Sequence, residues 1–447
     1  MTATETGVEA QVPPGAVATG LTAGQRLKAI LGGSAGNLVE WYDWFVYSFF
    51  AVYFSAHFFP GGDELAGLLK TMAVFAVGFF ARPLGAWLMG LYADHAGRRT
   101  ALTAAVAMMC AGSLIIAVLP SHETIGVAAP ILLVTARILQ GLSVGGEYGA
   151  SATYLAEMAG KRRRGFWSSF QFVTMVMGQL IALGILSLLQ NSLGKPELEA
   201  WGWRIPFVIG ALLAVVVFWI RARMDESQSY ENARASGAER ARTMMLFARY
   251  PKETITILGF TAGGSLAFYA FTTYMPKFLT AKAHAQPFAE HTATAITAGA
   301  LVVYLFALPV FGWISDHFSR RATLWLAFGG GGLVAYPALQ TLAATTNPWL
   351  AFGLVSLLVV LLSGYNSVSA VVKAELFPAN VRALGVALPY GIGTAIFGGT
   401  AESIAIAFQR AGHEERFYLY VAGMMGLAFL TIFLLPDNRR HSLILED

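Results

Sequence analysis

The feature that most constrains this chain is a series of twelve long apolar runs separated by short polar breaks. A membrane-spanning helix needs about 20 predominantly apolar residues, and the runs are of that order. They are too long and too continuously apolar for the alternating strands of a membrane barrel. The sequence therefore predicts an all-α membrane protein with twelve transmembrane helices, at residues 30–56, 66–91, 100–119, 127–155, 165–190, 204–222, 253–279, 292–315, 322–342, 349–375, 384–409 and 416–435.

Composition agrees with a lipid environment. Only 13% of the 447 residues are charged, against about 25% in soluble proteins. The net charge of +4 is modest, and the basic residues lie in short loops, so we expect no nucleic-acid partner. Cys110 is the single cysteine, which excludes an internal disulfide. The first 25 or so residues lack the features of a cleaved signal peptide, so the first apolar run should direct insertion.

Lys and Arg accumulate in alternate loops, which predicts the orientation. Basic residues cluster at Arg98–Arg99, Lys161–Arg164, Arg221–Lys252 and Arg320–Arg321, whereas the opposite loops carry few. Loops rich in Lys and Arg stay on the cytoplasmic side. Both termini should therefore be cytoplasmic.

The longest polar stretch between spans lies at residues 223–250 and predicts two six-helix halves. It contains many helix formers, so we interpret it as a cytoplasmic linker helix, either a simple tether or a part of gating. The predicted organisation is a cytoplasmic tail, an N-terminal bundle, the linker, a C-terminal bundle and a second cytoplasmic tail, at residues 1–26, 27–222, 223–250, 251–436 and 437–447.

An internal repeat supports the two halves, because motifs at cytoplasmic helix ends recur at nearly constant spacing. GLYADHAGRR after span two returns 222 residues later as GWISDHFSRR after span eight, and AEMAGKRRRG after span four returns 218 residues later as AELFPANVRALG after span ten. Acids at one helix end can pair with arginines of a neighbouring loop when that side is closed. The predicted gating residues are Asp94, Arg98, Arg99, Glu157, Arg164, Asp316, Arg320, Arg321, Glu375 and Arg382. The alternative is topology determination by positive charge alone, to which Asp94 and Asp316 would add nothing.

Ionisable residues inside the spans are the strongest functional markers. At about 1.5 Å of rise per residue, Arg82 and Arg137 lie near the middle of spans two and four. Buried arginines need anions, either substrate carboxylates or protein carboxylates. Both are candidate substrate ligands.

Span one supplies the carboxylates. Glu40 and Asp43 are three residues apart and Tyr47 follows by four, so all three share one helical face. Glu147 lies in span four, nearer the cytoplasm. A carboxylate in a low-dielectric site can take up and release protons near neutral pH. Asp43, Glu40 and Glu147 are therefore candidates for proton coupling, with a permanent ion pair as the structural alternative.

The middle of the C-terminal half is mostly neutral and offers hydrogen bonds and aromatic walls. The candidate substrate ligands outside the two arginines are Tyr47, Tyr269, Tyr274, Tyr304 and, in span five, Gln171. The alternative is that these side chains only pack against their neighbours. No Walker motif, metal-ligand spacing or nucleophile-elbow motif is present, so we expect no ATP, cofactor or metal and no enzyme activity.

The motif G-x-x-x-D-x-x-G-R-R after span two, with a copy after span eight in which Ser319 replaces the second glycine, resembles the signature of the major facilitator superfamily. GNLVEWYDWFVY, FFARPLGAWLMG and ARILQGLSVGGEYGASATYLAE resemble the metabolite:proton symporter family. Within it, GFTAGGSLAFYAFTTYMPKFL and IFGGTAESIA are most similar to the alpha-ketoglutarate permeases.

This resemblance implies two pseudo-symmetric six-helix bundles in a bacterial inner membrane, and monomeric import of a dicarboxylate such as 2-oxoglutarate with protons by alternating access. It also implies that Asp43, facing Arg137, carries the proton, with Glu40 as the second choice. Other organic acids (citrate and other tricarboxylates, or shikimate) and osmoprotectants remain alternatives. A transporter-like metabolite sensor is the alternative from another class.

Overall fold

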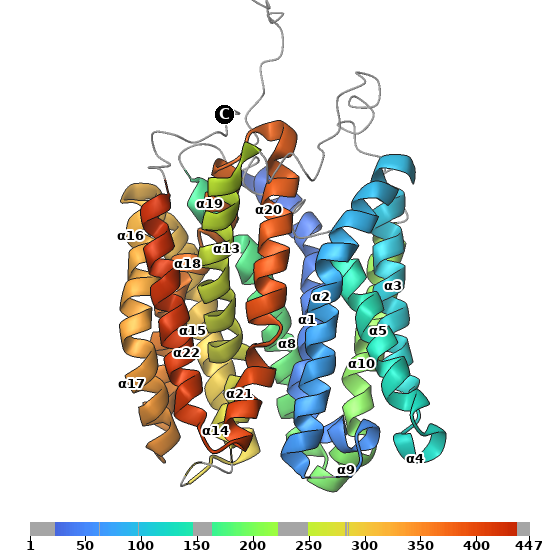
Figure 1. Cartoon of the computed structure of the whole chain (residues 1–447). Helices are drawn as coiled ribbons and strands as arrows, with labels where there is room; N and C mark the ends of the chain where they lie inside the picture. Colours follow the sequence, from blue (N-terminus) through green and yellow to red (C-terminus); the bar gives the residue numbers. More distant parts are fainter. Residues whose placement is uncertain are drawn as a thin grey trace, which may run out of the picture.

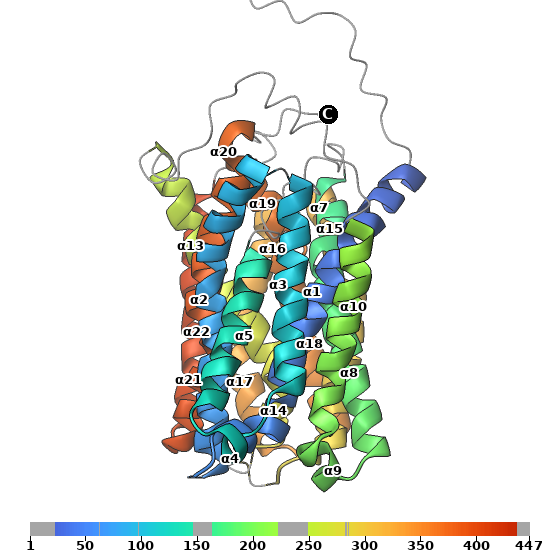
Figure 2. The same cartoon turned by 90° about the vertical axis from the view of Figure 1, so that its right-hand side faces the viewer.

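The computed structural model describes residues 23–61, 63–96, 98–145, 163–221, 249–281, 284 and 286–435. Within these ranges the regular structure is entirely helical, and the helices run side by side along one direction (Figures 1 and 2). The N-terminal half lies on the right of Figure 1 and the C-terminal half on the left.

Among the described residues, the N-terminal half has six long helical segments and three short ones. The long segments are α1 (Ala23–Phe58), α2 (Glu64–Ala96), α3 (Arg98–Val118), α5 (Ala128–Gly145), α7 with α8 (Arg164–Ser168 and Phe170–Ser192) and α10 (Ile205–Arg221). The short ones are α4 (His122–Ile125), α9 (Lys195–Ala200) and η1 (Gly202–Arg204).

The C-terminal half repeats the arrangement, but five of its six segments change helical type or break along their length. The segments are α13, η2 and α14 (Pro251–Phe268, Tyr269–Thr273 and Met275–Leu279), α15 (Glu290–His317), α16, η3 and α17 (Arg320–Trp325, Leu326–Gly330 and Gly331–Ala344), α18 and α19 (Pro348–Asn366 and Ser369–Glu375), α20, η4 and α21 (Ala379–Gly393, Thr394–Gly398 and Ala401–Arg410), and α22 with η5 (Glu414–Thr431 and Ile432–Leu434). The segments η2, η3 and η4 are π-helical turns, which often occur at functional sites.

Local sequence explains several helix starts. Pro251 and Pro348 occupy the first turns of α13 and α18, where a missing N–H costs nothing. Asn347 caps α18, because its side-chain oxygen accepts hydrogen bonds from the backbone N–H groups of Trp349 and Leu350.

The prediction of twelve transmembrane helices is confirmed. Ten helices of the described residues are long and apolar enough to span a membrane. The segment α1 completes the N-terminal half although Asn37, Glu40 and Asp43 interrupt its apolar character, and α3 contributes the shorter apolar stretch Thr103–Val118. The predicted linker lies almost wholly outside the described residues, as does the end of predicted span four beyond Gly145, and the domain boundaries stay predictions.

The halves contact each other along α8, which packs against α15, and along α2, which packs against α20 and α21. Within the N-terminal half, α2 and α5 approach so closely that a Cβ at Gly141 would collide with the Gly78 carbonyl oxygen. This agrees with the glycine-mediated packing that the small residues of span four favour. We call the end at which α1 begins and η5 ends the termini end, and the opposite end the α9 end (Figure 2).

Candidate functional site

A small cavity lies between the two halves. It is lined by Phe172 and Met175 of α8, Gly264, Ser265, Phe268 and Tyr269 of α13 and η2, Tyr365 and Asn366 of α18, and Tyr390 of α20. Its volume of about 10 Å³ holds about one water molecule. The halves therefore enclose a mostly aromatic chamber that must widen before it can hold an organic solute.

Arg82 of α2 lies beside this chamber in an aromatic setting. Its guanidinium carbon is 3.9 Å from the centre of the Trp44 ring and 4.1 Å from that of Phe79. The side chain also interacts with Tyr269, which lines the cavity. The Nε and Nη2 atoms are buried and have no hydrogen-bond partner among the described residues. A buried cation with unused donors at a cavity wall is suited to binding a carboxylate.

Arg137 of α5 is fully buried and lies between the Trp44 and Tyr47 rings, with its guanidinium carbon 4.1 and 4.4 Å from their centres. Its Nη1 donates a hydrogen bond to Gln140 Oε1 at 2.6 Å. As in Arg82, the Nε and Nη2 atoms have no partner within the described structure.

Asp43 is joined to Arg137 through Gln140. Gln140 Nε2 donates to Asp43 Oδ2, and the Ser113 hydroxyl donates to Asp43 Oδ1, both at 2.5 Å. No ion pair within 4.0 Å joins Asp43 and Arg137 in the described part of the chain, so the predicted facing of the two side chains is mediated. Sequence reasoning missed Gln140, although its position three residues after Arg137 places it on the same helical face.

Of the other two proton-coupling candidates, the structure describes Glu40 alone. Glu40 is buried on α1 and interacts electrostatically with Arg82. Glu147 lies outside the described residues.

Two of the five remaining substrate-ligand candidates are connected to the cavity. Tyr269 lines it directly. The Tyr304 hydroxyl accepts a hydrogen bond from the side chain of Asn366, which is itself a lining residue.

Three candidates are not lining residues of the cavity. The Tyr47 hydroxyl donates to the Thr71 carbonyl oxygen at 3.1 Å, which ties α1 to α2. Tyr274 packs edge-on against Phe417. Gln171 is buried on α8, next to the lining residue Phe172. Their role as substrate ligands stays a prediction.

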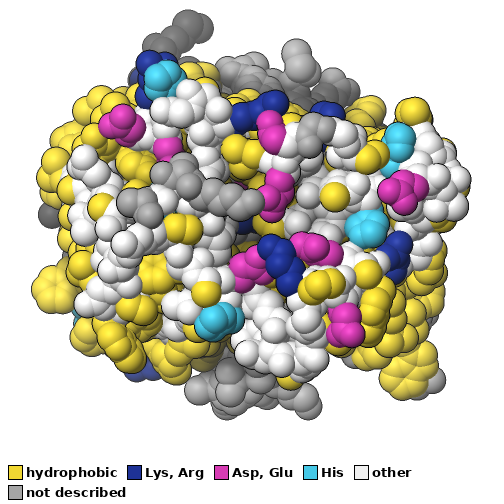
Figure 3. Space-filling view, turned by 90° about the horizontal axis from the view of Figure 1, so that it is seen from below, with side chains coloured by type: hydrophobic (Ala, Val, Ile, Leu, Met, Phe, Trp, Pro, Cys, Tyr) yellow, Lys and Arg dark blue, Asp and Glu magenta, His cyan; other side chains and the backbone are white. Residues whose placement is uncertain are grey.

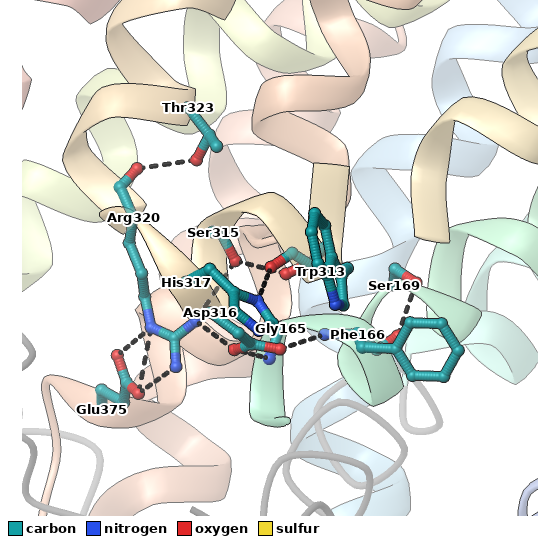
Figure 4. Close-up of polar contacts among 11 residues, drawn as sticks. Gly165, Phe166, Ser169, Trp313, Ser315, Asp316, His317, Arg320, Thr323 and Glu375 are labelled. Carbon is teal, nitrogen blue, oxygen red and sulfur yellow. Dashed lines mark hydrogen bonds and ion pairs between the residues drawn. The ribbon is translucent and has the colours of Figure 1, made fainter. Parts of the chain in front are cut away.

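At the termini end, one carboxylate connects the two halves (Figure 4). Asp316 at the end of α15 accepts hydrogen bonds from the backbone N–H groups of Gly165 and Phe166, at 2.8 and 2.9 Å. Arg320 forms ion pairs with Asp316 at 3.3 Å and with Glu375 at 3.0 Å. The acid–arginine pairs expected from the repeat are thus present within the C-terminal half, whereas the bond between halves goes to backbone amides.

Close backbone approach makes these bonds possible. A Cβ at Gly312 would lie 2.6 Å from the Gly165 carbonyl oxygen, nearer than real Cβ atoms come. Gly312, the first residue of the repeated motif, is therefore where α15 crosses α7.

Of the remaining predicted gating residues, the structure describes the side chains of Arg164, Arg321 and Arg382. Arg164 and Arg382 are buried, and Arg382 Nε donates to the Phe377 carbonyl oxygen at 3.2 Å. The Arg321 guanidinium lies 5.6 Å from the Trp325 ring centre. The structure does not describe Glu157 or the side chains of Asp94, Arg98 and Arg99.

A buried polar triad closes the bundle toward the α9 end, and sequence reasoning missed it. Lys277 of α14 forms an ion pair of 2.7 Å with Glu402 of α21, both within the C-terminal half. Ser48 of α1 donates to Glu402 at 2.6 Å and accepts from Lys277 at 2.7 Å. No spacing pattern in the sequence connects positions so far apart.

Further polar contacts join the halves at the α9 end, where acidic and basic side chains lie together near the middle of the face (Figure 3). Lys195 Nζ lies 2.7 Å from Glu290, which also accepts a hydrogen bond from the Tyr53 hydroxyl. The hydrogen bond to Glu290 raises the pKa of Lys195. Arg410 pairs with Asp63 at 3.3 Å. Both ends of the bundle are therefore closed in the described structure.

The described residues contain no group of three or more His, Cys, Asp or Glu side chains that could hold a metal ion.

Comparison with solved structures defines the class. The chain superposes on the partially occluded inward-open xylose transporter XylE from E. coli with a TM-score of 0.74 and 18% identity, over 92% of this chain and 98% of that one. The fold is that of the major facilitator superfamily, two pseudo-symmetric six-helix bundles.

Sequence comparison defines the family. The family model "Sugar (and other) transporter" matches residues 29–246 and 230–444. The alpha-ketoglutarate permease of Escherichia coli (strain K12) is 47% identical over 92% of this chain and 94% of its own length. The citrate-proton symporter of Klebsiella pneumoniae is 34% identical over 86% of each chain. The chain thus belongs to the metabolite:proton symporter family of the major facilitator superfamily and is a multi-pass membrane transporter, not an enzyme.

Proposed function

We propose that this protein imports a dicarboxylate such as 2-oxoglutarate together with protons, by alternating access. The observation that carries the proposal is the pair of buried guanidiniums, Arg82 and Arg137, each with two donor atoms that lack a partner among the described residues. The identity to an alpha-ketoglutarate permease supports the choice of substrate.

The proposed orientation places the termini end in the cytoplasm of a bacterium, because Arg320, Arg321 and the helix ends that flank the other Lys- and Arg-rich segments lie at that end. The chain functions as a monomer in the inner membrane, with lipid, the organic anion and protons as its partners.

Asp43 takes up the proton in this scheme. While Asp43 is charged, Gln140 directs its amide N–H to Asp43 and its oxygen to Arg137. Protonation of Asp43 removes the negative charge that offsets Arg137, which then attracts a substrate carboxylate more strongly. Proton uptake and anion binding favour each other, as symport requires. Glu40 offers a second acid beside Arg82.

Membrane voltage sets a lower limit on the proton count. Moving one net negative charge into a cell that is negative inside costs about 2.3 kcal/mol per 100 mV. A dianion with one proton would move against this field, whereas two protons make the cycle electroneutral. We therefore expect at least two protons per dicarboxylate. Substrate-dependent currents that carry net negative charge inward would contradict this.

Arg82→Lys tests the site. Lysine keeps the charge but loses the planar fork that binds a carboxylate through two bonds. Uptake of labelled 2-oxoglutarate into proteoliposomes under a proton gradient should show an affinity lowered by about tenfold or more, the effect of losing a hydrogen bond between charged groups. Arg416→Lys, at an exposed position of α22, is the matched control. Unchanged affinity in Arg82→Lys would make Arg82 a structural residue.

A competition panel of dicarboxylates, tricarboxylates, shikimate and betaine in the same assay separates the substrate alternatives. The proposal requires that 2-oxoglutarate compete best. A sensor would show no substrate-dependent proton uptake at all.

A further inference from the structure

Lys373 of α19 is a fully buried cation of the C-terminal half that the proposed function does not yet use. Its Nζ donates to the Ser369 hydroxyl at 2.7 Å and lies 4.0 Å from the centre of the Tyr390 ring. The rings of Tyr365 and Phe260 are each 5.8 Å away. Charged side chains at membrane depth are costly and mark ligand pathways.

The side chain of Lys373 extends toward the middle of the bundle. Helical side chains lean toward the N-terminus of their helix, and the α18–α19 segment starts at the α9 end. The hydrogen bond to Ser369, one turn earlier, confirms this direction. The ammonium group therefore lies deeper in the membrane than Glu375, which belongs to the gate at the termini end.

Two of the rings around Lys373 are also walls of the central cavity, namely Tyr365 and Tyr390. Arg82 approaches the same Tyr390 from the other half, because the two side chains interact electrostatically. The backbones agree, since a Cβ at Gly391 would lie 3.8 Å from the Pro83 ring. The Tyr390 side chain thus interacts with one cation of the N-terminal half and one of the C-terminal half.

We propose that Lys373 binds the second carboxylate of the substrate, opposite Arg82, and thereby makes the site selective for dianions over monoanions. This inference rests on the proposed function and deepens it. Since the closed cavity holds about one water molecule, the Tyr390 ring must move when the substrate enters between the two cations. A ligand held by one cation from each half also favours closure of the halves around it.

The test compares a diacid with its monoamide. Inhibition constants of 2-oxoglutarate and of its monoamide at the carboxylate remote from the keto group are measured against uptake of labelled 2-oxoglutarate in proteoliposomes. Lys373→Met should weaken the diacid by about 10- to 100-fold, the effect of losing a hydrogen bond to a charged group, and leave the monoamide unchanged. Lys373→Arg should retain the preference for the diacid. Lys70→Met removes a lysine at an exposed position of α2 and serves as the control.

Equal weakening of diacid and monoamide in Lys373→Met, or no change in either, would overturn the role of Lys373. If Lys373→Met does not fold, Lys373→Gln is measured in the same way, and its diacid-to-monoamide ratio decides between the same outcomes. Failure of the proposed function looks different, because the unmodified protein would then take up no 2-oxoglutarate.

Discussion

The buried triad near the α9 end allows a quantitative test of how this end is held shut. Ser48 is its single contribution from the N-terminal half, and the ion pair between Lys277 and Glu402 lies wholly in the C-terminal half. When the halves separate at this end, Ser48 must leave both charged partners. Its two hydrogen bonds therefore count toward the closed state and not toward the open one.

Ser48→Ala removes these two bonds and leaves the ion pair intact. Each hydrogen bond to a charged group contributes about 1.5 to 3 kcal/mol. Water can replace part of this when the end opens, so we expect a net loss of about 2 to 3 kcal/mol, which shifts the open-to-closed ratio by about 30- to 150-fold. Glu402→Gln would be a poorer test, because it leaves Lys277 buried without its counter-charge, at a cost of about 3 to 5 kcal/mol to the fold itself.

The measurement is the distance between spin labels on either side of the α9 end, by double electron–electron resonance. Glu197→Cys and Glu415→Cys provide exposed sites on α9 and α22 in a Cys110→Ser background. Ser48→Ala should raise the population at long distance. Ser55→Ala, two turns along α1 and outside the triad, should not. An unchanged distance distribution in Ser48→Ala would refute the reasoning that the triad holds this end closed.

Three further predictions follow from the other contacts. Gly312→Ala places a Cβ against the Gly165 carbonyl oxygen, so the termini end should open and a Met175→Cys thiol in the cavity should be alkylated faster. Gly353→Ala, which has open space around it, is the control. Equal alkylation rates in the two variants would contradict the close crossing of α15 and α7. Gln140→Leu breaks the connection between Asp43 and Arg137, so proton-driven accumulation should fall by about tenfold or more while substrate exchange at equal pH persists; parallel loss of both would assign Gln140 to substrate binding instead. Glu290→Gln removes the exposed pair with Lys195 and should cost about 1 kcal/mol or less of stability. Because the pKa of Lys195 is raised, this side chain loses its charge only when the pH rises through that raised value. Glu290→Gln should therefore lower the unfolding temperature equally at pH 7 and pH 9. A lowering at only one of the two pH values would be incompatible with the ion pair.

The sequence predicted the fold well because the bilayer restricts the choices. Apolar run length identifies the helices, and the repeated motif divides them into two halves. The first span is the least typical, since Asn37, Glu40 and Asp43 form a polar stripe along it. It was still predicted, because the rest of the run is apolar. The family resemblance, not the spacing of residues, implied that Asp43 faces Arg137, and the structure joins the two through Gln140.

Contacts between distant positions could not be predicted in the same way. Periodicity places Lys277 and Glu402 at membrane depth but contains nothing that pairs them, and Ser48 is an ordinary small residue of a helix. Asp316 was expected to pair with an arginine, and Arg320 lies 3.3 Å from it. Its bonds to the amides of Gly165 and Phe166 depend on how closely α15 and α7 approach, which side-chain charge does not reveal. Lys373 lies only two residues before Glu375, and the direction of its side chain, not its position in the sequence, brings it to the cavity wall.

The two ends of the bundle are held together by different chemistry, and this difference has a consequence for transport. At the α9 end, a hydroxyl of one half joins a buried ion pair of the other, whereas at the termini end a carboxylate caps backbone amides across a glycine contact. Both sets of bonds are present around a cavity too small for an organic anion. Opening one end breaks the bonds between the halves at that end and keeps those at the other end, so the two losses must be similar in free energy for the halves to alternate. A substrate that bridges Arg82 and Lys373, as proposed, stabilises the enclosed arrangement whichever end opens next. Ser48→Ala and Gly312→Ala act on opposite ends, so each should favour opening of its own end and leave the ligands of the anion unchanged.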